Sequence, residues 1–448
     1  MSTITRWSLT LAVALLVIIG LVIAMLTNPR FFTGQPEAHY TPASATPAAQ
    51  PEPVLHKLDP DAPQPENLTP ILDEILADGD DGSHFHGSVI DIQTGDELYQ
   101  HDADEPGAPA SSLKTVTAIA ALETLGADTE LETTTTLNGD TVVLTGHGDV
   151  SLTGEKLAQL AKDTADKLAE QGIDSINVRL DDTLFGTAQH NDAWDISLYT
   201  SNNITAIYPI AMYEGRANDQ PHAAYQEDPA KVALDTFVAA LKDYVEVDNI
   251  SRGGSNDAGE ADSGAGQELA SVHSEPVAEL IKHMLLVSDN YLAETFGRLV
   301  AVQQGMDAAD AGQAVAQVAQ QHGASHVELV DTSGLAAKDR ISTSDLARVL
   351  RSAARSDDPA VRNMLYSMPI AGYSGTMANR LLENTSQFPV RAKTGSLTSV
   401  ATLTGVAVTA DGRAVTFSFF ANQPGDVLAP HTQTLDKAVD ALTACGCR

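Results

Sequence analysis

The sequence predicts an α+β fold in which one antiparallel sheet, built from strands at both ends of the chain, carries helices on both faces and holds an inserted second domain. Two observations lead to this prediction. Strand-like runs lie near the two ends of the chain and flank a middle that is dominated by helices from residue 275 onward. A threonine-rich unit at residues 129–268 has strands and helices of its own. The length of 448 residues exceeds one ordinary core and suffices for two domains with tails.

Residues 1–69 precede the folded part. The run Trp7–Leu26 is almost wholly apolar and uncharged, and about 20 such residues can cross a bilayer. We therefore expect a transmembrane signal anchor at residues 7–26, with residues 1–6 in the cytoplasm and the rest of the chain extracytoplasmic at the cell membrane. Prolines recur through residues 27–69, which predicts an extended linker. Cleavage near Ala43 would instead secrete the chain.

The larger domain is expected at residues 70–128 and 269–448. In its first part we expect a helix at 70–77, strands at 84–92 and 97–101, and a helix at 112–125 that ends at Gly126. In its second part we expect helices at 276–287 and 291–302, two or three further helices, strands at 388–392, 401–409 and 414–420, and a last helix at 429–442.

The inserted domain is expected at residues 129–268. Its strands are predicted within 131–144 and at 176–180, and its helices at 155–171 and 230–245. A glycine-rich loop at 253–259 lies close to its end. No nucleophile and base lie together in this unit, so we place the chemistry in the larger domain.

The charge of the chain excludes one class of partner. Sixty acidic residues against 26 basic residues give a net charge of -34. Nucleic-acid phosphates require a basic surface, and the sequence has no basic patch in its folded part. We therefore expect no nucleic-acid partner and a solvated acidic surface.

Ser111 and Lys114 stand three residues apart at the start of the helix expected at 112–125, so their side chains project from the same face. A serine hydroxyl becomes nucleophilic when a neighbouring base takes its proton, and a lysine is such a base once burial or a second cation lowers its pKa. Free N–H groups of the first helical turn would also stabilise an oxyanion beside Ser111. The alternative is that Ser111 only caps a core helix.

Two further polar stretches are candidates for the same site. Ser288-Asp289-Asn290 separates two expected helices, whereas similar serine–asparagine pairs at 175–177 and 201–203 lie in the inserted domain. Lys393-Thr394-Gly395-Ser396 lies on the first C-terminal strand. There a lysine and a hydroxyl can bind a carboxylate, and Gly395 lets a substrate lie close along the strand. The alternative for Lys393 is an exposed strand cation.

S-x-x-K, S-D-N and K-T-G in this order resemble the serine acyl-transferases that recognise penicillin. No other lysine of the chain follows a serine at this spacing. The large insertion between the first two motifs is similar to that of the D-alanyl-D-alanine carboxypeptidases of the penicillin-binding protein 4 type, peptidase family S13. Other stretches resemble the same family, from about residue 70 to the C-terminus: 144–153, 331–335, 368–372 and 375–377. The insertion looks shorter than in the longest family members.

For acylation, the resemblance implies that Ser111 attacks the carbonyl of the penultimate D-alanine and that Lys114, kept neutral by burial and by Lys393, accepts its proton. The backbone N–H groups of Ser111 and Ser396 would form the oxyanion hole. Penicillin would acylate the same serine, and its tethered leaving group would make hydrolysis slow. Neither a metal nor an organic cofactor is implied.

On the leaving-group side, the resemblance implies that Ser288, backed by Lys393, passes a proton to the departing D-alanine. Asn290 would hold the substrate amide, and Lys393 and Thr394 would bind the terminal carboxylate. The expected substrates are peptidoglycan stem peptides ending in D-Ala-D-Ala, with cross-linked stems as a further target of endopeptidase activity.

Two alternatives remain at this stage. A class A β-lactamase carries a glutamate within an E-x-x-x-N pattern about three dozen residues after S-D-N, whereas here Glu328 is followed four residues later by Thr332. A non-catalytic cell-wall-binding scaffold on the same fold would be expected to lack one of the motif residues, and all are present.

Overall fold

The computed structural model describes residues 68–78, 82–186, 189–220, 222–253, 266–382, 390–422 and 429–445. The expected cytoplasmic tail at 1–6, the signal anchor at 7–26 and most of the linker at 27–69 lie outside these ranges. Among the residues that are described, no helix is long and apolar enough to cross a bilayer.

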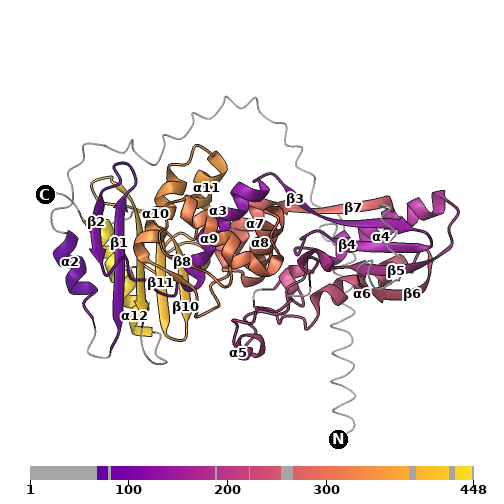
Figure 1. The fold of residues 1–448 in the computed structure, drawn as a ribbon, viewed down its shortest axis with the longest axis horizontal. Helices are drawn as coiled ribbons and strands as arrows, with labels where there is room; N and C mark the ends of the chain where they lie inside the picture. The colour runs from indigo at the N-terminus through magenta and orange to yellow at the C-terminus, as the bar shows by residue number, and fades with distance from the viewer. Residues whose placement is uncertain are drawn as a thin grey trace, which may run out of the picture. The chain divides into compact units, whose positions relative to one another are not determined.

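Strands from both ends of the chain form one antiparallel sheet, as predicted (Figure 1). Its order is β10-β11-β12-β1-β2, so the first strand of the described chain pairs with the last one, with His84 opposite Asn422. The strands are β1 (His84–Asp91), β2 (Glu97–His101), β10 (Arg391–Leu397), β11 (Val400–Val408) and β12 (Ala414–Asn422). Because β10 is an edge strand, its residues can take part in a site.

The two faces of this sheet are covered by different helices. Phe417 and Phe419 of β12 belong to the core formed with α2 (Leu68–Ile75) and α12 (Ala429–Ala444). Thr416 points the opposite way, as strand alternation requires, and its hydroxyl donates to the Ala347 carbonyl of α10 (Thr343–Ala354). The prediction of helices on both faces is therefore confirmed.

A second, helical core lies beyond α10. Its centre is α3 (Lys114–Leu125), in which every residue from Lys114 to Leu122 is buried. A helix that is buried on all sides lies at the centre of a core. The elements around it are α7 (Val277–Val287), α8 (Asn290–Gln303), α9 (Ala311–Gln321), α11 (Pro359–Ser367) and the short strands β8 (Val327–Glu328) and β9 (Arg340–Ile341).

The inserted segment has a sheet of its own, in the order β6-β5-β4-β3-β7, with both parallel and antiparallel pairs. Its elements are β3 (Glu130–Asn138), β4 (Thr141–Gly146), α4 (Gly154–Glu170), β5 (Ser175–Asp181), α5 (Ile196–Thr200), α6 (Pro229–Leu241), β6 (Glu246–Arg252) and β7 (Gln267–Pro276). The helices α4 and α6 share the apolar core of this sheet. β7 continues past residue 268 and runs directly into α7.

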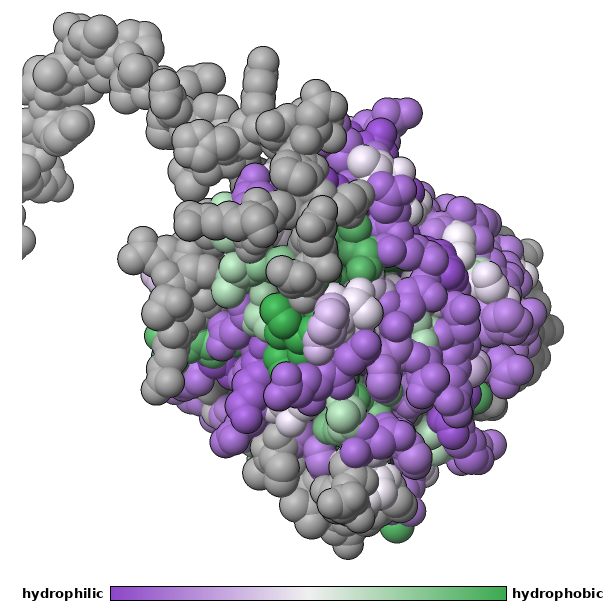
Figure 2. Space-filling model, turned by 90° about the vertical axis from the view of Figure 1, so that its left-hand side faces the viewer, coloured by the Kyte–Doolittle hydropathy of each residue, from purple (hydrophilic) through white to green (hydrophobic). Residues whose placement is uncertain are grey.

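The surface agrees with the charge of the chain. Figure 2 shows one face of the molecule, and hydrophilic residues cover most of the described part of it, with small apolar areas between them. A hydrophilic face on a chain with a net charge of -34 agrees with the expected solvated acidic surface.

Candidate active site

Ser111 lies in a 3₁₀ turn (Ala110–Leu113) that leads directly into α3. Neither the turn nor α3 has a side-chain cap, so the alternative of Ser111 as a mere helix cap is wrong. The neighbouring Ser112 fixes the turn instead. Its buried Oγ lies 2.8 Å from Thr402 Oγ1 on β11, and that hydroxyl donates to the Pro109 carbonyl over 2.8 Å. The turn is thereby attached to β11, the strand next to the edge of the sheet.

Lys114 is fully buried, and its Nζ lies between three oxygen atoms. It is 3.0 Å from Ser111 Oγ, 2.7 Å from Asn290 Oδ1 and 2.6 Å from the Ser333 carbonyl oxygen. A neutral amine has two N–H donors and one lone pair. The amide and carbonyl oxygens can only accept, so they take both donors, and the lone pair remains for the hydroxyl of Ser111.

Two buried lysines share the site, and both have lowered pKa values. Burial lowers the pKa of Lys114 to about 8, against the opposing effect of the carboxylates of Asp331, Asp289 and Glu294. Burial also lowers the pKa of Lys393 well below its usual value, and the charge of Lys114 lowers it further. The site therefore makes both amines easier to deprotonate than an exposed lysine.

The loop Asp331–Leu335 packs against the nucleophile turn at Gly334. A Cβ at this position would lie 1.9 Å from the Ala110 carbonyl oxygen, and the residue has a φ of +79°. Only glycine fits both restrictions. The loop can therefore approach closely enough for Ser333 to contact Lys114.

The Ser288-Asp289-Asn290 junction is brought to the same point. Ser288 ends α7 in the left-handed conformation, with φ 61° and ψ 44°, which is unusual for a residue with a side chain. Asp289 caps α8 through the N–H of Leu292. Asn290, the first residue of α8, contacts Lys114, while Ser288 Oγ lies 2.8 Å from Lys393 Nζ. The junction thus contacts both lysines.

Lys393, Thr394, Gly395 and Ser396 all lie on β10, as expected, although this strand runs from Arg391 to Leu397 and not over 388–392. Lys393 is fully buried, so the alternative of an exposed strand cation is wrong. The Thr394 hydroxyl donates to Thr376 Oγ1 over 2.8 Å. The Ala392 N–H points away from β11, and the alternation along a strand directs the N–H of Ser396 the same way.

A glycine is required at position 395 for a different reason from the one expected. A Cβ here would lie 2.1 Å from Thr402 Oγ1 and 2.9 Å from the Pro109 carbonyl oxygen. The glycine is thus required by the packing of the nucleophile turn on β10, before any substrate is considered.

Several groups that were not predicted from the sequence contact the motif residues. The carbonyl oxygens of Ser333 and Asn203 accept from Lys114 and from Asn290 Nδ2, over 2.6 and 2.9 Å. Asn203 belongs to one of the serine–asparagine pairs that were set aside. Backbone acceptors carry no residue signature, although the resemblance at 331–335 already marked the loop of Ser333.

A cavity of about 600 Å³ extends beside β10. Leu335 borders it on the loop, Leu397 and Thr398 border it beyond Ser396, and Ala193 and Asp195 border it on the inserted segment. No residue of the three motifs lines this cavity, which begins one residue beyond Ser396 and has the volume of a ligand-binding cleft.

The chain was compared with known proteins. The model of the D-Ala-D-Ala carboxypeptidase 3 (S13) family matches residues 68–261 and 214–444. Carboxypeptidase DacB of Mycolicibacterium smegmatis is 33% identical over 99% of both chains. The chain belongs to the D-Ala-D-Ala carboxypeptidase 3 (S13) family. Carboxypeptidase Rv3627c of Mycobacterium tuberculosis, a second relative of this S13 enzyme, is 32% identical over 86% of this chain and 85% of that one.

Penicillin binding protein 4 (dacB) from Haemophilus influenzae has the same fold as this S13 enzyme. Its crystal structure matches with a TM-score of 0.65 at 22% identity, over 83% of this chain and 98% of that one. The predicted fold and family are thereby confirmed. The S13 enzyme is a serine-type D-Ala-D-Ala carboxypeptidase.

Proposed function

We propose that this enzyme removes the terminal D-alanine from peptidoglycan stem peptides through an acyl intermediate on Ser111. The observation that carries the proposal is the position of Lys114 Nζ, which lies 3.0 Å from Ser111 Oγ while two other acceptors occupy its N–H groups. This arrangement leaves the lysine one function, which is to accept the proton of the serine.

In the acylation step, Ser111 Oγ forms a bond to the carbonyl carbon of the penultimate D-alanine, and its proton goes to Lys114. The outward N–H of Ser396 and the N–H of Ser111 donate to the oxyanion. The peptide bond then breaks, and the amine of the terminal D-alanine takes a proton from Ser288, which receives one from Lys393. Water finally attacks the ester carbonyl and its proton restores Lys393, while Ser111 Oγ leaves with the proton held by Lys114 and the shortened peptide is released.

The terminal carboxylate is assigned to Lys393 and Thr394. The neutral state of Lys393 in the free site is favoured by its burial, and an arriving carboxylate favours its protonation. The Thr394 hydroxyl, 2.8 Å from Thr376 Oγ1, supplies a second hydrogen bond beside it. The stem peptide is assigned to the cavity between Leu335 and Leu397.

The proposal is tested on the purified enzyme with two substrates. A peptide ending in D-Ala-D-Ala should release D-alanine, and a cross-linked stem dimer measures any endopeptidase activity. After incubation with penicillin and proteolysis, mass spectrometry should find the added mass on the peptide that contains Ser111. Added mass on another residue, or no D-alanine release from enzyme that penicillin acylates, would contradict the proposal.

The pH profile of acylation identifies the base. Lys114 must be neutral to accept a proton, and its pKa is about 8. The second-order rate constant for acylation by penicillin should therefore rise with pH through about 8 and then level off, at constant ionic strength. A rate that falls over this range would exclude Lys114 as the base. Rapid turnover of penicillin would instead favour the β-lactamase alternative.

We also propose that residues 7–26 anchor the enzyme in the cell membrane with the catalytic part outside the cytoplasm. The support is the uncharged apolar run Trp7–Leu26 followed by a proline-rich linker. The full chain should sediment with membranes, and a chain that starts at residue 27 should not. Sedimentation of both would refute the anchor.

A further inference from the structure

The inserted segment forms hydrogen bonds to both places that accept from Lys114. It contacts Asn290 directly, and it contacts the loop that carries the Ser333 carbonyl. The Asn203 carbonyl accepts from Asn290 Nδ2 over 2.9 Å. Trp194 Nε1 donates to Asp331 Oδ2 over 2.7 Å, in the loop that carries Ser333. These two contacts come from residues far from every catalytic motif in the sequence.

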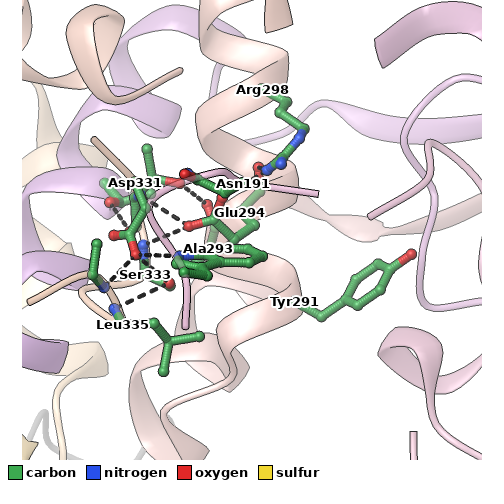
Figure 3. Close-up of polar contacts among 12 residues, drawn as sticks. Asn191, Tyr291, Ala293, Glu294, Arg298, Asp331, Ser333 and Leu335 are labelled. Carbon is green, nitrogen blue, oxygen red and sulfur yellow. Dashed lines mark hydrogen bonds and ion pairs between the residues drawn. The ribbon is translucent and has the colours of Figure 1, made fainter. Parts of the chain in front are cut away.

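Asp331 is the centre of the loop. Its carboxylate, 1% exposed, accepts from the N–H groups of Gly334 and Ala336, both over 2.7 Å, and from the Trp194 indole. Figure 3 shows Asp331 at the meeting point of several of the dashed contacts, next to Ala293 and Glu294 of α8. The first two donors belong to the loop and to the residue that follows it, so the indole is a donor to Asp331 that fixes the loop from outside.

Glu294 of α8 holds the other side of the same loop. It accepts from the N–H groups of Thr332 and Ser333, over 2.9 and 3.0 Å, and pairs with Arg298 at 2.7 Å (Figure 3). The Ser333 peptide is thus held between two buried carboxylates. Its carbonyl oxygen can then stay 2.6 Å from Lys114 Nζ.

The Asn203 carbonyl decides the orientation of the Asn290 amide. Because a carbonyl oxygen can only accept, Nδ2 must face it, and Oδ1 must face Lys114. With the amide reversed, an N–H group would take the lone pair of Lys114 and leave none for Ser111. The inserted segment therefore supports the base on two sides.

We propose that Trp194 is a positioning residue for the reaction, which acts through Asp331 and the Ser333 carbonyl to hold the lone pair of Lys114 toward Ser111. This inference rests on the proposed role of Lys114. It gives the inserted domain a part in proton transfer, and the 7% exposure of Trp194 makes that contact a buried one.

The test measures acylation of the full chain by penicillin. Trp194→Phe keeps an aromatic ring and removes the N–H donor to a carboxylate, so the acylation rate constant at saturating penicillin should fall at least about tenfold. The dissociation constant of the non-covalent complex should stay the same, because Trp194 is buried and does not line the cavity beside β10. A lower acylation rate constant with an unchanged dissociation constant indicates a positioning role. A general loss of folded enzyme would lower the amount of acylated protein and leave both constants unchanged.

The control is Asn191→Ala. Asn191 Nδ2 donates to the Val330 carbonyl over 2.7 Å, from the same segment to the residue before the loop, and no hydrogen bond joins it to Asp331 (Figure 3). Its acylation rate constant should equal that of the wild type. Equal losses in the two variants would mean that only docking of the segment matters, and would overturn the inference.

A second variant removes the N–H without changing the shape of the ring. The chain has two tryptophans, so in Trp7→Phe protein Trp194 is the only one. Replacing it with benzothienylalanine puts sulfur in the place of the N–H. The same fall in the acylation rate constant should result, and a rate within twofold of the Trp7→Phe parent overturns the inference. If the parent itself is not acylated on Ser111, the proposed function fails instead.

Discussion

Ser111→Ala is expected to abolish both acylation by penicillin and release of D-alanine. The substitution removes the oxygen that forms the covalent bond, and loss of a catalytic nucleophile lowers turnover by a factor on the order of 10⁴ or more. Labelling with a fluorescent penicillin, followed by denaturing electrophoresis, measures the first effect. Release of D-alanine from a D-Ala-D-Ala peptide measures the second.

The neighbouring serine is the matched control for this experiment. Ser112 Oγ contacts Thr402 Oγ1 and the Lys393 carbonyl, and its side chain is fully buried. Ser112→Ala should lower the free energy of unfolding by about 1 kcal/mol and retain labelling. Ser111 makes no capping bond, so Ser111→Ala should leave the unfolding midpoint unchanged. Labelling that persists in folded Ser111→Ala enzyme would place the nucleophile elsewhere.

The second large effect is expected on stability. Glu294→Ala leaves the guanidinium of Arg298 buried without its carboxylate, and it also leaves the N–H groups of Thr332 and Ser333 without an acceptor. Breaking a buried ion pair on one side costs about 3–5 kcal/mol. The midpoint of urea unfolding, followed by circular dichroism, should therefore fall markedly.

Asp235→Ala is the comparison for the second prediction. Asp235 pairs with Lys231 one helical turn away, and both side chains are more than half exposed. Exposed pairs of this kind contribute little, so the urea midpoint should stay unchanged. A Glu294→Ala midpoint as close to the wild type as that of Asp235→Ala would show that the buried pair does not stabilise the loop.

The sequence was sufficient to predict the sheet built from both ends, the family, and the three motifs that the structure brings together. These predictions rested on residue types with narrow chemical roles, such as the serine and lysine at the start of α3. The strand that holds Lys393 was placed too early because Lys-Thr-Gly-Ser has little of the composition of a strand. β6 was missed because nearly all its side chains are exposed and show no alternation.

The contacts of Lys114 with its surroundings could not be predicted in the same way. Two of the groups that hold the site are backbone carbonyls, and any residue type can supply a carbonyl. Trp194 has no motif at all, and only the folded chain brings its indole to Asp331. Gly395 was predicted to let a substrate lie close to the strand. The structure shows that a side chain at this position would clash with the chain's own nucleophile turn, so the glycine is required for packing.

The pairing of β1 with β12 determines when the large sheet can fold during synthesis of the chain. The first strand of the described chain can pair with β2 at once, but its partner on the other side ends at Asn422. A ribosome must therefore finish nearly the whole polypeptide before the middle of the sheet can close, and folding with such distant partners is slow. Until then β10 has no sheet to join, so a growing chain carries Ser111 without the lysine at 393 and stays inert until its last strands emerge.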